Sequence, residues 1–158
     1  MTATQPTRKD LAEFFRLGLR AGVCDLLSIV RWADGIISSE PSPPFAFFDL
    51  SVCESQPDSA AISFLSEVPG EHTPDVTLHM LLGHCSRLVH SGAFAPADIL
   101  VRLHRLNRTE HFPDCVDSAI RNLNEDYHLA HDGIHGTVES VARAFTDYLS
   151  RFDQYAPV

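Results

Sequence analysis

Apolar residues recur at spacings of three and four along most of the chain, which is the pattern of helices that bury one face. Thr7, followed by Asp10 three residues later, predicts the start of a first helix, and Gly22 predicts its end. A second helix is expected to bury a stripe made of Val23, Leu26, Leu27, Val30, Ala33 and Ile37.

Prolines, glycines and capping residues divide the rest of the chain into further helices. The apolar and aromatic stretch 45–53 fits a short helix or a buried strand, and its helical surroundings favour the helix. Later helices are expected to begin near Pro57, Thr73, Pro96, Pro113 and Thr137. No segment alternates as a strand does, so the sequence predicts an all-α fold. We expect one domain over residues 1–158, a bundle of seven or eight short helices.

Length and composition are those of an ordinary globular domain, with 158 residues and 44% apolar content. The N-terminus has no apolar stretch of the kind that opens a secretory signal, and no run reaches the roughly 18 apolar residues of a membrane span. Four cysteines lie in or beside apolar patterns and are expected to be buried free thiols. These features predict a cytoplasmic protein that does not enter a membrane.

Charge is the most uneven property of the sequence. The chain has 12 basic and 21 acidic residues, a net charge of −9, and from Trp32 to Ser86 it carries no lysine or arginine. That stretch holds eight acids: Asp34, Glu40, Asp49, Glu54, Asp58, Glu67, Glu71 and Asp75. Such a one-signed region repels nucleic acid and anionic lipid and attracts a basic protein.

Trp32, the only tryptophan, has two interpretations that the sequence leaves open. Its ring would sit beside the apolar stripe of the second helix, either as an edge residue of the core or as an aromatic anchor in a binding face. In the second case Asp34 and the loop 43–45 would flank it.

Nine histidines raise a metal-binding alternative. His128, His131 and His135 form the tightest cluster, and histidines three or four apart on a helix are used in zinc and iron sites. Gly133 and Gly136 interrupt this run, which favours a solvated helix end. The cluster matches no strong metal signature.

Other candidate chemistry is weaker. Cys85 follows His84, but adjacent helical residues point about 100° apart and cannot face each other. A ridge formed by Arg102, Arg105 and Arg108 is interpreted as an intramolecular partner of acids or as a solvated face, because the chain as a whole is too acidic for nucleic-acid binding. No catalytic residue, metal site or cofactor is predicted.

Short motifs carry a resemblance to a known group of proteins. The succession Trp32-Ala33-Asp34, Ile37, Pro43-Pro44 and Asp49-Leu50-Ser51 resembles a pattern in small bacterial all-helical proteins, some of which are similar to immunity proteins that neutralise a co-encoded toxin. The match covers about twenty of the 158 residues. The resemblance implies a role by occlusion without catalysis, and it implies that the acidic tract faces the toxin.

The sequence therefore predicts a cytosolic protein-binding module of the immunity type, with no enzyme activity, that neutralises a basic toxin by occlusion. The alternative is a metal-dependent enzyme or metal sensor that uses the histidine cluster. The predicted partner-binding residues are Trp32, Asp34, Glu40, Phe45, Glu54, Asp58, Glu67 and Glu71.

Overall fold

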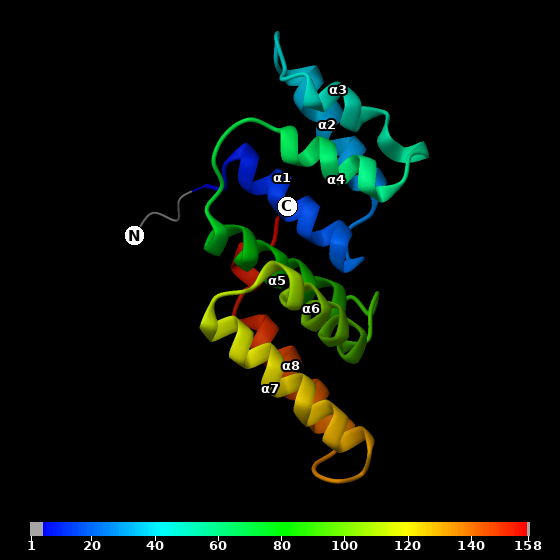
Figure 1. Ribbon diagram of the computed structural model, residues 1–158, viewed down its shortest axis with the longest axis vertical. Coiled ribbons are helices and arrows are strands. Elements are labelled where there is room, and N and C mark those ends of the chain that lie inside the picture. Colours follow the sequence, from blue (N-terminus) through cyan, green and yellow to red (C-terminus); the bar gives the residue numbers. More distant parts are fainter. Residues whose placement is uncertain (1–4, 158) are drawn as a thin grey trace. The chain divides into compact units, whose positions relative to one another are not determined.

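The computed structural model describes residues 5–157, and all the regular structure in that range is helical (Figure 1). The elements in chain order are α1 (Arg8–Ala21), α2 (Leu26–Ser39), α3 (Ala46–Ser51), η1 (Cys53–Ser55), α4 (Asp58–Glu67), α5 (Pro74–His90), α6 (Pro96–Glu110), α7 (Asp114–His131), α8 (Val138–Ser150) and η2 (Asp153–Tyr155). The predicted all-α fold is confirmed. The stretch 45–53, which the sequence left between helix and strand, forms α3 and the start of η1.

Local capping explains where several helices begin and end. Thr7 and Asp10 form a capping box at the start of α1, and Gly22 ends that helix with a φ of 73°. Thr137 and Ser140 form a second capping box before α8. No helix within residues 5–157 combines the length and apolar character that a membrane crossing requires.

The chain forms two compact units, the first ending at Thr77 and the second beginning at Leu78. In the first unit α2 packs against α3, α3 against α4, and α4 against α1. Its core contains Ile29, Phe47, Leu50, Cys53 and Leu65, all fully buried. The single domain expected over residues 1–158 stays a prediction.

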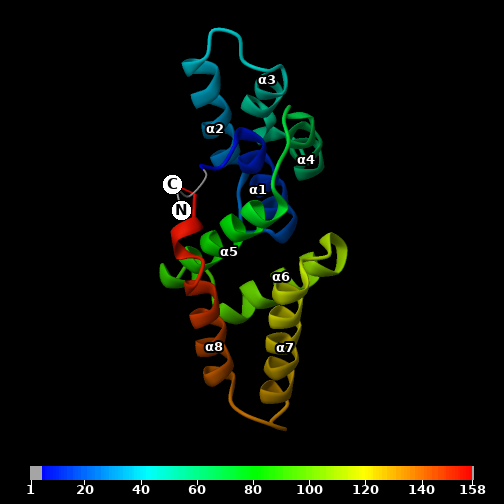
Figure 2. The same cartoon turned by 90° about the vertical axis from the view of Figure 1, so that its left-hand side faces the viewer.

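In the second unit α6 packs against α7 and α8, and α7 and α8 lie side by side as an antiparallel pair (Figure 2). The C-terminal segment returns to α5, where Ser86 donates a hydrogen bond to Asp153 and Arg87 donates one to the Pro157 carbonyl. Gly83 of α5 lies directly beneath this segment. A Cβ placed there would stand 2.7 Å from the backbone N of Ala156 and closer still to the Phe152 carbonyl oxygen.

Two expectations about burial are wrong. Leu27 is exposed, whereas Ile29 is fully buried in its place. The reason is that α2 begins only after its cap Asp25, so Val23 lies outside the helix and does not set the phase of its buried face. Cys115, expected to be buried, is exposed on α7, while Cys53 and Cys85 are buried as expected.

Buried charged groups join three helices of the first unit. The Asp10 carboxylate accepts hydrogen bonds from the backbone N–H of Thr7, at 2.7 Å, and of Thr73, at 2.8 Å. Lys9 donates to the carbonyls of Leu65 and Ser66 at the end of α4, where a cation is favoured by the helix dipole. The start of α1 is therefore tied to the end of α4 and to the start of α5.

Replacing Asp10 with Asn should lower the free energy of unfolding of the first unit by about 2 kcal/mol, because an amide can accept only one of these two hydrogen bonds. Chemical denaturation of the two proteins measures this difference. Asp34→Asn, which changes an exposed carboxylate, is the control and should alter stability by less than about 0.5 kcal/mol.

The same substitution has an expected pH dependence. Burial raises the pKa of Asp10, but hydrogen bonds from Thr73 and Thr7 outweigh it, so the pKa lies below its ordinary value of 3.8. The contribution of Asp10 to stability is then complete above the ordinary pKa and is lost as pH falls through the lowered one. The stability difference between wild type and Asp10→Asn should be constant near neutrality and shrink below about pH 4. A difference that grows on acidification would contradict this assignment.

Gly83→Ala should destabilise the second unit by about 1–3 kcal/mol, since the new methyl group meets backbone atoms of the C-terminal segment. Thermal unfolding measures the effect. Gly35→Ala is a matched control within α2, where a Cβ meets nothing within 4 Å. That substitution should be neutral or stabilise by roughly 0.5–1 kcal/mol, because alanine is the better helix former.

Candidate functional site

The short helix α3 is apolar on two opposite sides. One side carries Ala46, Phe47 and Leu50, which are buried against α2 and α4. The other side carries Phe45, Phe48 and Val52, whose exposed fractions are 79%, 43% and 62%. A helix that is apolar all round is normally buried all round, so the second side is a helix face without an intramolecular cover.

Helical geometry brings these three exposed residues together. Phe45 already has helical backbone angles, with φ −59° and ψ −35°, so positions 45, 48 and 52 share one side of α3 at spacings of three and four. The rings of Phe45 and Phe48 contact each other, with centroids 6.1 Å apart. Phe45, Phe48 and Val52 are called the α3 stripe below.

Acids lie beside the α3 stripe. Asp49 is on α3 itself, one helical turn from both Phe45 and Val52. Glu54 lies in η1 and Asp58 opens α4, and both are exposed. Burial raises the pKa of the Cys53 thiol, and the charges of Glu54 and Asp58 raise it further, so both carboxylates act on the same buried sulfur. Glu54 and Asp58 thus lie near Cys53, which follows the C-terminal end of α3.

The other predicted acids lie elsewhere in the first unit. Asp34 is exposed on α2, and Glu40 at the end of α2 forms an ion pair with Arg8. Glu67 ends α4 and Glu71 follows it, so Glu67 is separated from Asp58 by the length of that helix, about 13 Å. Within residues 5–157, Glu40 is the one member of the eight-acid tract that forms an ion pair with a basic side chain.

Trp32 lies at the edge of the core. Its ring is half-buried between Phe15, at 5.2 Å, and Phe47, at 5.1 Å. This position matches the first of the two interpretations that the sequence left open. Trp32 contacts α3 through Phe47, and the exposed aromatic side chains at α3 are Phe45 and Phe48. Of these two, Phe45 was predicted from the sequence to bind the partner.

Sequence reasoning found Phe45 but missed Phe48, Val52 and the flanking Asp49 as members of one face. The stretch 45–53 could have indicated this face, because it contains more apolar residues than one face of a helix can hold. Which side of α3 is covered depends on α2 and α4, and that is not encoded in the stretch itself.

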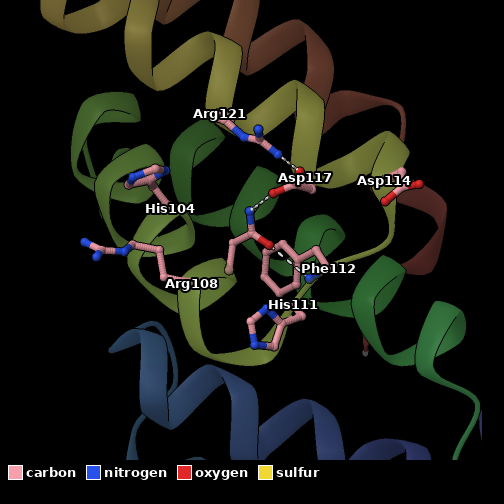
Figure 3. Close-up of a pocket in the computed structure, with 8 residues that line it drawn as sticks. His104, Arg108, His111, Phe112, Asp114, Asp117 and Arg121 are labelled. Atoms are coloured by element: carbon pink, nitrogen blue, oxygen red, sulfur yellow. Dashed lines mark hydrogen bonds and ion pairs between the residues drawn. The ribbon is translucent and has the colours of Figure 1, made fainter.

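The second unit contains a polar pocket of about 520 Å³ where α6 meets α7 (Figure 3). It is lined by His104, Asn107, Arg108, His111, Phe112, Asp114, Asp117 and Arg121. Asn107 organises it, because its amide nitrogen donates to Asp117 at 2.7 Å and its oxygen accepts from the backbone N–H of Phe112 at 2.9 Å. Arg121 pairs with the other oxygen of Asp117.

The histidine cluster lies at the other end of α7. His128 and His131 are exposed in the last turn, and His135 is exposed in the loop that follows. Among the residues that the structure describes, no group of three His, Cys, Asp or Glu side chains could hold a metal ion. The basic ridge is also divided, since Arg102 stacks on Phe94 while Arg105 and Arg108 are exposed.

Comparison of this chain with protein-family models, with curated proteins and with solved structures found no match in any of the three.

Proposed function

We propose that this chain is a protein-binding module of the immunity type, which neutralises a basic toxin by occluding it. The partner would contact the α3 stripe and the acids beside it, Asp49, Glu54 and Asp58. The observation that carries this proposal is an apolar helix face, exposed to solvent, that is flanked by carboxylates without basic partners in residues 5–157.

The acids would increase the rate at which the protein associates with a basic partner. The first unit contains five basic and eleven acidic residues, a net charge of −6, against −3 for the second. A field of this sign raises the association rate of a basic protein by factors of about 10 to 1,000 at low salt. It gives little affinity once the complex has formed, because rim charges stay solvated.

The α3 stripe would supply the affinity. Aromatic side chains that become fully desolvated are the usual energetic centres of protein interfaces, and charged side chains around them exclude water. Phe45 and Phe48 already contact each other in the unbound chain, so little side-chain entropy would be lost on binding.

The protein would act in the bacterial cytoplasm, without a cofactor, beside a gene for the toxin. Its activity would be blockage of a basic surface and not a chemical step. The partner to test is therefore the basic domain encoded by the neighbouring reading frame.

Replacing Phe45 and Phe48 together with Ser should raise the dissociation constant for that domain at least about tenfold, mainly through faster dissociation. Both side chains are exposed, so the circular dichroism spectrum and the unfolding midpoint should stay close to wild type. Kinetic binding measurements give both rates. Unchanged dissociation in a folded double variant would exclude the α3 stripe from the interface.

The variant Glu54→Lys/Asp58→Lys should slow association and flatten its dependence on salt, since it reverses two charges beside the α3 stripe. Glu67→Lys/Glu71→Lys makes the same change of charge at the far end of α4 and is the matched control. Equal slowing by both variants would mean that the partner senses only total charge, and no binding by wild type would refute the proposed function itself.

A further inference from the structure

The pocket between α6 and α7 has more hydrogen-bond donors than its own acids use. Asp117 accepts from Asn107 at one oxygen and pairs with Arg121 at the other. The hydrogen bond from Asn107 is the main reason why the pKa of Asp117 lies below its ordinary value, with Arg121 adding to it. Both oxygens of this acid therefore already have a partner within the protein.

The second acid is turned away from the remaining donors. In Figure 3, Asp114 lies on the opposite side of the pocket from His104 and Arg108. It is the first residue of α7, where a carboxylate is favoured by the helix dipole. Asp117 thus interacts with α6 through its hydrogen bond from Asn107 and through the charge of His104, and neither acid forms an ion pair with Arg108.

That side presents three nitrogen-bearing side chains in a row. His104 and Arg108 are four residues apart on one face of α6, and His111, the residue that ends the helix, lines the same pocket. Within the described part of the chain, none of the three side chains forms a hydrogen bond or ion pair with a protein acceptor.

The helix dipole accounts for cations at this end of α6, but it does not account for two further observations. The Nδ1 atom of His104 is buried without a hydrogen-bond partner. Since a buried N–H without an acceptor is costly, the favoured neutral ring carries its proton on Nε2 and can donate there.

The second observation is the backbone of His111. Its φ of 54° is the one positive value found outside glycine in residues 5–157. Glycine would hold this position at the end of a helix with less strain, and a strained side chain of this kind is often kept for a function.

We propose that this pocket binds the phosphate group of a small phosphorylated molecule. Arg108 would supply the charge, and the imidazoles of His104 and His111 would each donate an N–H, because a guanidinium and two imidazoles lining one pocket are donors that suit a phosphate oxyanion. The volume of about 520 Å³ leaves room for the rest of such a molecule. This site lies in the second unit and is independent of the proposed protein partner.

Inorganic phosphate is the first probe, with acetate as a carboxylate and chloride as the baseline, all at equal ionic strength. Saturable shifts in the NMR amide signals of Asn107, His111 and Phe112 are expected with phosphate. Arg108→Gln should weaken the dissociation constant about tenfold or more, because it removes a charged donor. Arg105→Gln removes an equal charge from an exposed position of α6 outside the pocket and should leave the constant unchanged.

His111→Gly separates binding from folding. It should raise the unfolding midpoint, since glycine adopts a positive φ without strain, and still weaken phosphate binding. Failure of phosphate to saturate over the millimolar range, an equal response to acetate, or equal loss in the Arg105 and Arg108 variants would each overturn the proposal.

Discussion

A buried carboxylate that accepts two backbone N–H groups from distant parts of the chain holds the first unit in place. Asp10 binds Thr7, three residues before it, and Thr73, sixty-three residues after it. Burying a charge costs several kcal/mol unless hydrogen bonds compensate it. Because both oxygens are satisfied, this charge fixes where α1 begins and where the chain returns to α5.

The neighbouring Lys9 extends the same constraint to α4. Its ammonium group is buried, and it satisfies the last carbonyls of α4 that no N–H of that helix can reach. Lys9 thus holds the end of α4 against α1, and α3 packs against α2 and α4 on one side. The other side, with Phe45 and Phe48, has no element left to cover it.

The second unit uses an uncharged group for the same purpose. Asn107 joins α6 to α7 by bonding the Phe112 backbone and the Asp117 carboxylate. Because Asn107 and Arg121 are the partners of Asp117, this acid accepts no hydrogen bond from His104, Arg108 or His111. Those three side chains have no protein acceptor in the described residues.

Much of the fold could be predicted from the sequence, because helix formation and helix ends depend on residues a few positions apart. Thr7 with Asp10, Gly22, Pro96 and Thr137 mark their helices by local hydrogen bonds and backbone preferences, and the structure has those boundaries. The excess of acids without nearby bases is likewise a property of the sequence alone.

Only the tertiary structure decided which apolar residues are buried. Ile29 is buried with Phe47 and Leu50 because α3 packs against that side of α2, whereas Leu27 is exposed. Phe47 is buried and Phe48 exposed because α2 and α4 cover one side of α3. The periodicity of apolar residues indicates that a helix has an apolar side. Where a helix has two such sides, the neighbouring helices determine which one is buried. For the same reason the pocket residues, which come from two helices and the turn between them, were not grouped by any spacing in the sequence.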